Sequence, residues 1–103
     1  MKKEFGEEIR ALREKQNLYL RDIAPRLNMD VAQLSKIENG IRQLKRKQIP
    51  VLAEILDTNA DALEVLWLAD QLFTVIKDEK FANEAIHITE KKLKYINRTT
   101  KAQ

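Results

Sequence analysis

Residues 30–40 read DVAQLSKIENG, and they predict a short helix with a signal at each end. Asp30 is a residue type that caps helix starts, and a glutamine follows three positions later, as in a capping box. Leu34 and Ile37 are spaced so that both point toward a core. Asn39-Gly40 then ends the helix, because these residue types tolerate a left-handed backbone. The opposite side of the helix starts with small or neutral residues, and we expect it to face a partner.

The segment before this helix predicts another short helix over about 20–27, which Pro25 is expected to bend by removing one backbone hydrogen bond. Asn28 follows, where a left-handed cap is expected. Two short helices joined by such a turn form the arrangement that offers the second helix to the major groove of DNA. Five side chains on or near its outer surface are the candidates to read bases, namely Val31, Ala32, Gln33, Ser35 and Lys36.

The chemistry of this surface suits the edges of base pairs. Gln33 can bond adenine N6 and N7, and Lys36 can bond guanine O6 and N7. A small apolar side chain such as Val31 can touch a thymine methyl group. The loop that follows the helix carries cations suited to the flanking phosphates, namely Arg42, Lys45, Arg46 and Lys47.

The distribution of charge along the chain agrees with a polyanionic partner. Residues 16–48 carry seven Lys or Arg against three Asp or Glu. Residues 49–79 carry one against seven, and residues 80–103 carry six against two. A basic block, an acidic block and a basic tail suggest one positive face, with the acidic part turned elsewhere.

The whole chain is predicted to be all-α. Its 103 residues include only two glycines and two prolines, while 44% are hydrophobic, so helix formers dominate and a core can be buried. The spacing of apolar residues predicts six helices, over about 3–16, 20–27, 31–38, 48–56, 60–77 and 78–97.

Composition argues against several other classes of protein. There is no cysteine and one histidine, and neither a glycine-rich phosphate loop nor a cluster of carboxylates beside a base is present. We therefore expect no enzyme, no cofactor and no metal site. The sequence shows no signal peptide and no apolar run long enough to span a membrane, so a cytoplasmic protein is expected.

Between Ile9 and Leu63 the chain resembles the Cro/CI-type (XRE) helix-turn-helix regulators of bacteria and phages. The matching segments are LREKQNL at 12–18, DIAPRLNMD at 22–30, LSKIENG at 34–40 and LAEILDTNADAL at 52–63. The resemblance implies a five-helix, lambda-repressor-like DNA-binding domain. It also implies a dimer that acts on near-palindromic operators.

The resemblance also implies roles for single residues. The base-reading positions of the family fall on the five outer side chains of the helix over 31–38. Asn39 and Arg42 match its phosphate contacts, and Arg13 and Glu38 match a pair that ties the first helix to the end of the third. Leu20 stands where many members carry a glutamine that contacts the DNA backbone. The candidates to replace that contact are Tyr19 and Arg21.

Residues beyond 68 lie outside the resemblance. Apolar residues surround the helix predicted over 60–77, which calls for a second packing partner. We expect residues 1–68 to form the DNA-binding domain and residues 69–103 to form a helical dimerisation segment. An intramolecular six-helix core is the alternative. The candidate dimer residues are Leu72, Phe73, Ile76, Phe81, Ile86, Leu93 and Ile96.

These observations predict a homodimeric regulator of transcription, a repressor or an activator, that binds double-stranded DNA at specific sequences. A controller of a restriction–modification locus is a possible subtype. The alternative is an antitoxin-like or anti-repressor-like module of the same fold, which chiefly holds another protein and binds DNA secondarily.

Overall fold

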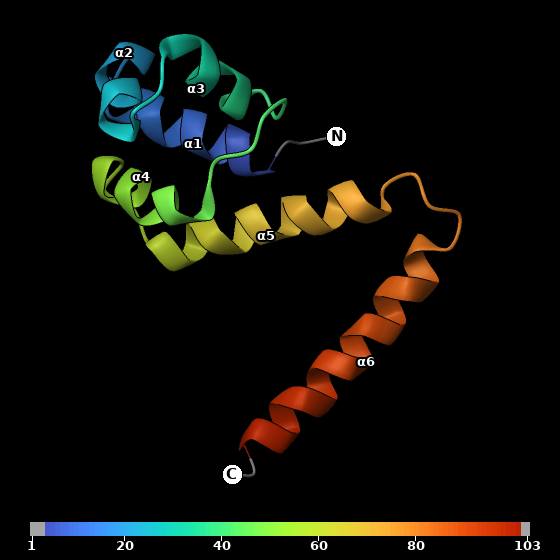
Figure 1. Cartoon of the computed structure of the whole chain (residues 1–103). Helices are drawn as coiled ribbons and strands as arrows, with labels where there is room; N and C mark the ends of the chain where they lie inside the picture. The colour runs from blue at the N-terminus through green and yellow to red at the C-terminus, as the bar shows by residue number, and fades with distance from the viewer. Residues whose placement is uncertain (1–3, 102–103) are drawn as a thin grey trace. The chain divides into compact units, whose positions relative to one another are not determined.

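The computed structural model describes residues 4–101, and this part of the chain consists of helices and their connections (Figure 1). This confirms the predicted all-α class. The elements are α1 (Glu4–Lys15), α2 (Leu20–Ile23), the 3₁₀ helix η1 (Ala24–Leu27), α3 (Val31–Glu38), the 3₁₀ helix η2 (Arg46–Gln48), α4 (Ile49–Ile55), α5 (Ala60–Ile76) and α6 (Ala82–Lys101).

Side chains at three helix ends explain where the short helices stop. Asn17 and Asn28 adopt positive φ angles of 57° and 55° after α1 and η1, and Asp57 does so at 53° after α4. Asn and Asp tolerate this left-handed conformation better than other residues with a side chain. Gly40, with a φ of 75°, does the same after α3. These turns fold the chain back on itself.

Pro25 stands where the predicted helix over 20–27 changes its type. The helix that starts at Leu20 remains α-helical only to Ile23, and the chain continues as a 3₁₀ helix with Pro25 in its first turn.

The start of the last predicted helix was placed wrongly. It begins at Ala82 instead of Asp78, because residues 77–81 form a turn in which the amide of Glu79 donates to the carbonyl of Ile76.

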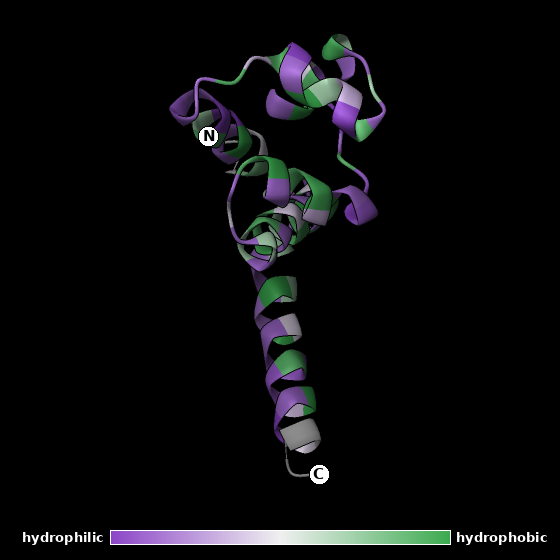
Figure 2. Ribbon diagram, turned by 90° about the vertical axis from the view of Figure 1, so that its left-hand side faces the viewer, coloured by the Kyte–Doolittle hydropathy of each residue, from purple (hydrophilic) through white to green (hydrophobic). Residues whose placement is uncertain are grey.

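The chain divides into two compact units, with the boundary between Gln71 and Leu72 inside α5. The first unit contains every buried apolar side chain of the described residues. These are Phe5, Ile9, Ile23, Ala24, Leu27, Leu34, Ile37, Leu44, Ile49, Leu52, Ala53, Ile55, Leu56 and Leu63. The second unit consists of the end of α5, a turn and α6. Figure 2 shows hydrophobic and hydrophilic residues alternating along α6.

Within the first unit, α1 lies unusually close to the end of α3. A Cβ atom built on Gly6 would stand 2.8 Å from the carbonyl oxygen of Ile37, and the carbonyl oxygen of Glu38 would be closer still. Backbone atoms cannot move aside as a flexible side chain can. Gly6 is therefore required by the approach of two helices and not by its own φ angle.

Candidate nucleic-acid interface

The start of α3 is fixed by its own cap. The carboxylate of Asp30 accepts a hydrogen bond of 2.8 Å from the amide of Gln33. Leu34 and Ile37 are buried on the inner side of the helix. Glu38, the last residue of the helix, is buried as well, and the other five side chains of α3 lie on the accessible side.

The five predicted base-reading residues all belong to this accessible side. Val31, Ala32 and Lys36 are exposed, whereas Gln33 and Ser35 are half-buried. Asn39 follows them at the end of the helix, and its amide nitrogen lies 3.5 Å from the hydroxyl of Ser35. The surface thus offers small, neutral or positive groups and no carboxylate, which suits an approach to base edges and phosphates.

The end of α3 is held by an ion pair with α1. Arg13 Nε donates to Glu38 Oε2 at 2.7 Å, and Nη2 donates to Oε1 at 3.0 Å. The remaining nitrogen, Nη1, donates to the carbonyl of Leu18 at 3.0 Å. The two side chains are 12% and 5% exposed, so the pair is largely shielded from water. The hydrogen bond to Glu38 raises the pKa of Arg13 above its ordinary value, against the smaller opposing effect of burial.

The loop after α3 is anchored by one apolar side chain and one indole. Leu44 is buried, and its carbonyl accepts a hydrogen bond of 2.7 Å from Trp67 Nε1 on α5. Arg42, Lys45 and Lys47 project from the exposed part of this loop. Within residues 4–101, none of these three cations forms an ion pair.

Arg46 differs from the other loop cations. Its Nη2 lies 2.6 Å from Glu64 Oε2, and its guanidinium lies 5.7 Å from the centre of the Trp67 ring. The side chain of Arg46 is therefore directed toward α5. The sequence alone groups Arg46 with the other loop cations as a phosphate contact. Its partner Glu64 lies 18 positions further along the chain, so no local pattern reveals the ion pair.

A small polar cavity of about 130 Å³ lies between the turn before α3, α3 itself and the basic loop after it. It brings Gln33 from α3 together with Arg42 and Lys45 from the loop. Its lining consists of Leu27, Asn28, Met29, Gln33, Ile37, Arg42, Gln43, Lys45 and Gln48. On one side of the cavity, the side-chain amide of Gln48 donates a hydrogen bond of 2.8 Å to the carbonyl of Leu27.

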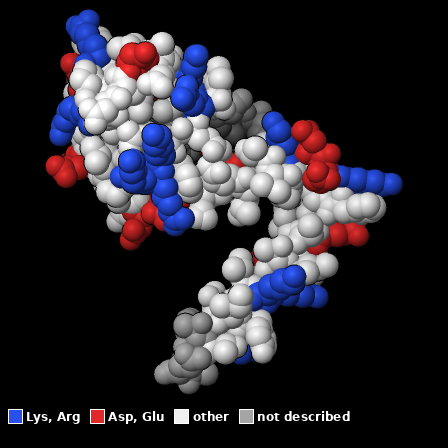
Figure 3. All heavy atoms as spheres, viewed as in Figure 1, with Lys and Arg blue, Asp and Glu red and all other residues white. Residues whose placement is uncertain are grey.

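The start of α2 contributes an aromatic side chain and a cation. The guanidinium of Arg21 lies 4.6 Å from the centre of the Tyr19 ring, and Tyr19 is exposed. Leu20 is half-buried and packs against the core, which gives a physical reason for an apolar residue at this position. Figure 3 shows how Lys and Arg side chains project from the visible face of the molecule.

The candidate dimer residues lie in the second unit. Six of them are exposed, namely Leu72, Phe73, Phe81, Ile86, Leu93 and Ile96, and Ile76 is half-buried.

Within the described residues, no helix is both long enough and apolar enough to pass through a bilayer.

A capped helix that is held across its neighbour, followed by a basic loop, defines the class of helix-turn-helix DNA-binding domains. A family model described as a helix-turn-helix domain matches residues 4–66, more than half of the chain. The chain belongs to this family, as its resemblance to the Cro/CI-type regulators predicts. Neither the curated proteins nor the solved structures include a significant match.

Proposed function

We propose that this chain is a sequence-specific regulator of transcription that inserts α3 into the major groove of double-stranded DNA. The polar cavity that joins Gln33 to Arg42 and Lys45 carries this proposal. The same cavity is lined by one side chain that could read a base and by two cations that could hold the neighbouring phosphates, which supports the proposal. One short helix could then be positioned by the backbone while its side chains read the sequence. The protein is proposed to act in the cytoplasm without catalytic activity, as is typical of such domains.

The division of labour follows from the position of each side chain. Val31, Ala32 and Lys36 are exposed and would lie against base edges. Asn39, at the end of α3, and the loop cations would lie against phosphates. Tyr19 and Arg21 are proposed as further backbone contacts at the start of α2, where Leu20 packs inward.

We further propose that two copies of the chain bind a near-palindromic operator. A single helix in the groove touches few base pairs, and two copies about one DNA turn apart, roughly 34 Å, would double the sequence that is read. The spacing of apolar residues on α6 supports this arrangement. The apolar residues Ala82, Ile86, Leu93 and Ile96, with the polar Thr89 at the middle position, recur at intervals of four, three, four and three residues, which is the spacing of a coiled-coil seam.

Selection of bound sites from a random DNA pool tests the proposed function. The wild-type chain should enrich two related half-sites. Gln33→Ala and Lys36→Ala should each weaken binding to the selected site by about 1–3 kcal/mol and relax the preference at particular positions. Lys77→Ala is the control, because it removes a positive charge outside the proposed interface. Enrichment of no sequence by the wild-type chain would overturn the proposal.

A further inference from the structure

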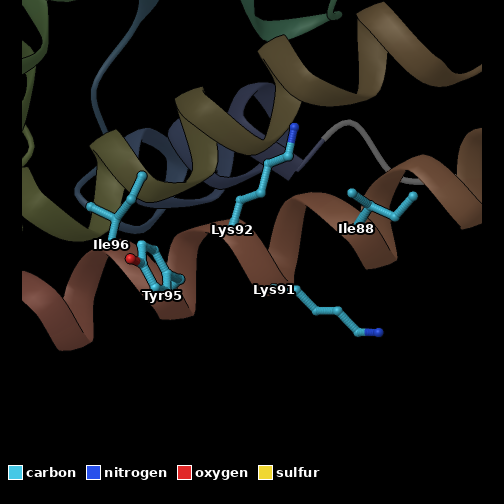
Figure 4. A pocket seen from close by; sticks show the side chains of 5 residues that line it. All are labelled: Ile88, Lys91, Lys92, Tyr95 and Ile96. Atoms are coloured by element: carbon cyan, nitrogen blue, oxygen red, sulfur yellow. The ribbon is translucent and has the colours of Figure 1, made fainter.

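One side of α6 carries a row of basic side chains that the proposed function does not use. His87, Lys91, Lys94 and Arg98 recur at intervals of four, three and four residues, and all four are exposed. At 100° per residue they fall within an arc of about 60°. The arc lies nearly opposite the apolar seam of α6. Figure 4 shows that Lys91 points away from the side of the helix to which Lys92 points.

Two carboxylates flank this row on α6, namely Glu84 and Glu90, but within the described residues neither lies at ion-pairing distance from its cations. Within residues 4–101, no ion pair involves Lys91, Lys94 or Arg98. The three ion pairs of the described residues, in contrast, each engage an arginine of the first unit. The rise of 1.5 Å per residue places Lys91 and Arg98 about 10 Å apart along the helix axis. This row is long enough to meet more than one phosphate of a DNA strand.

The helix dipole does not account for the whole row. Cations stabilise the last turn of a helix, and the effect falls off within that turn. α6 ends at Lys101, so Arg98 is placed to have this effect. Lys91 and Lys94 lie about two or more turns before the helix end and gain little from the dipole.

We propose that Lys91, Lys94 and Arg98 form a second DNA contact, one that binds phosphates without reading sequence. The inference rests on the proposed function, because the first unit must bring the chain to DNA. Because α6 is covalently linked to the first unit, its contact with the same duplex would be an intramolecular event. Contacts between cations and phosphates that are too weak to bind DNA alone can then add to the affinity of the whole chain.

The position of the row is compatible with a dimer. The apolar seam and the basic row occupy different sides of α6, so a second copy of the chain could cover the seam while the row remains free. A basic amphipathic helix can also lie on an anionic membrane. DNA is the favoured partner here because the same chain carries a helix-turn-helix domain.

The salt dependence of DNA binding tests this inference with the full-length chain. K91Q/K94Q is compared with K77Q/K80Q, which removes the same charge from residues at the turn before α6. The logarithm of affinity falls with the logarithm of salt concentration by about 0.9 per phosphate contact. K91Q/K94Q should therefore reduce this slope by about 1.8 per protomer if each lysine holds one phosphate. The control should leave the slope unchanged, and both variants should keep the wild-type base preference.

The other outcomes separate the inference from the proposed function. Circular dichroism and light scattering must show that both variants keep the helicity and the oligomeric state of the wild-type chain. A wild-type slope in K91Q/K94Q, with base preference retained, would overturn the inference and leave the proposed function standing. Loss of binding to phosphatidylserine vesicles in this variant, with an unchanged slope on DNA, would also overturn it and assign the row to a membrane. Absence of any base preference in the wild-type chain would instead overturn the proposed function.

Discussion

The guanidinium of Arg13 holds both carboxylate oxygens of Glu38, at 2.7 and 3.0 Å, although the two residues are 25 positions apart. Glu38 is the last residue of α3, and Arg13 lies in the last turn of α1. A two-point contact between flat groups restricts rotation as well as distance. The end of the proposed recognition helix is therefore oriented by the first helix of the domain.

Loss of Arg13 should destabilise the first unit strongly. Arg13→Ala leaves Glu38 buried without its partner, and we expect a loss of about 3 kcal/mol in the free energy of unfolding. Arg10→Ala is the matched control, since the Arg10–Glu14 pair is exposed and should contribute less than about 1 kcal/mol. Urea denaturation followed by circular dichroism measures both values. Equal effects of the two substitutions would show that the Arg13–Glu38 pair is not structural.

Protonation of Arg13 should not make the free energy of unfolding depend on pH near neutrality. The pKa of Arg13 is raised in the folded state, chiefly by the hydrogen bond to Glu38. A raised pKa gives stability that is fully present below the unfolded pKa and is lost only as the pH rises through the folded one. Between about pH 6 and 9, the difference in stability between the wild-type chain and the double variant Arg13→Ala/Glu38→Ala, which removes both groups of the pair, should therefore stay constant. A difference that shrinks toward pH 9 would contradict this assignment.

Gly6→Ala should destabilise the domain even though alanine is the better helix former. The helix propensity of alanine would favour the substitution by about 1 kcal/mol. The new Cβ would, however, overlap carbonyl oxygens of Ile37 and Glu38, and such overpacking typically costs about 1–3 kcal/mol or more. Thermal denaturation of Gly6→Ala is compared with that of Glu7→Ala, an exposed neighbour on α1. A rise in the melting temperature of Gly6→Ala would mean that α1 and α3 are further apart than the structure has them.

Lys45 and Arg46 should differ in their effect on DNA binding, although they are neighbours in the basic loop. Lys45→Ala should lower the salt slope by about 0.9, as expected for one phosphate contact. Arg46→Ala should lower it less, because Glu64 already holds the guanidinium. Glu64→Gln should free Arg46 and make the slope steeper. Equal losses in Lys45→Ala and Arg46→Ala, with no effect of Glu64→Gln, would show that DNA displaces Glu64 completely.

The seam on α6 predicts which substitutions should separate the two copies. Leu93→Glu places a charge in the seam and should give a monomer by light scattering at tens of micromolar, while the helix-turn-helix domain stays folded. Ile88→Glu is the matched control, because Ile88 is equally exposed but lies outside the seam. Half-site binding should persist weakly in Leu93→Glu, and cooperative binding to the palindrome should be lost. A wild-type chain that is monomeric under these conditions would contradict the dimer and favour a heterologous protein partner.

The helix-turn-helix segment could be predicted because its signals are local. Asp30 caps α3, Asn28 turns the chain before it, and Leu34 and Ile37 mark its buried side. Each signal acts over a few residues, so the sequence shows it directly. The last helix shows the limit of such signals. Asp78 resembles a helix cap, but it lies in the turn that closes onto Ile76.

The features that sequence reasoning missed depend on contacts between distant residues. Gly6 has no unusual φ angle, and its role follows only from the approach of α1 to α3. Arg46 belongs to a cluster of cations, and only the fold shows that Glu64 and Trp67 lie against it. Whether the remaining site residues contact DNA stays a prediction.

Trp67 is the only tryptophan of the chain, and its indole nitrogen is bonded to the backbone of the basic loop. The ring lies beneath Arg46 and is half-buried. Intrinsic fluorescence excited selectively at the indole therefore originates from this one position. A shift in its emission maximum would report rearrangement around the loop, so the unlabelled protein carries its own optical probe of the proposed interface.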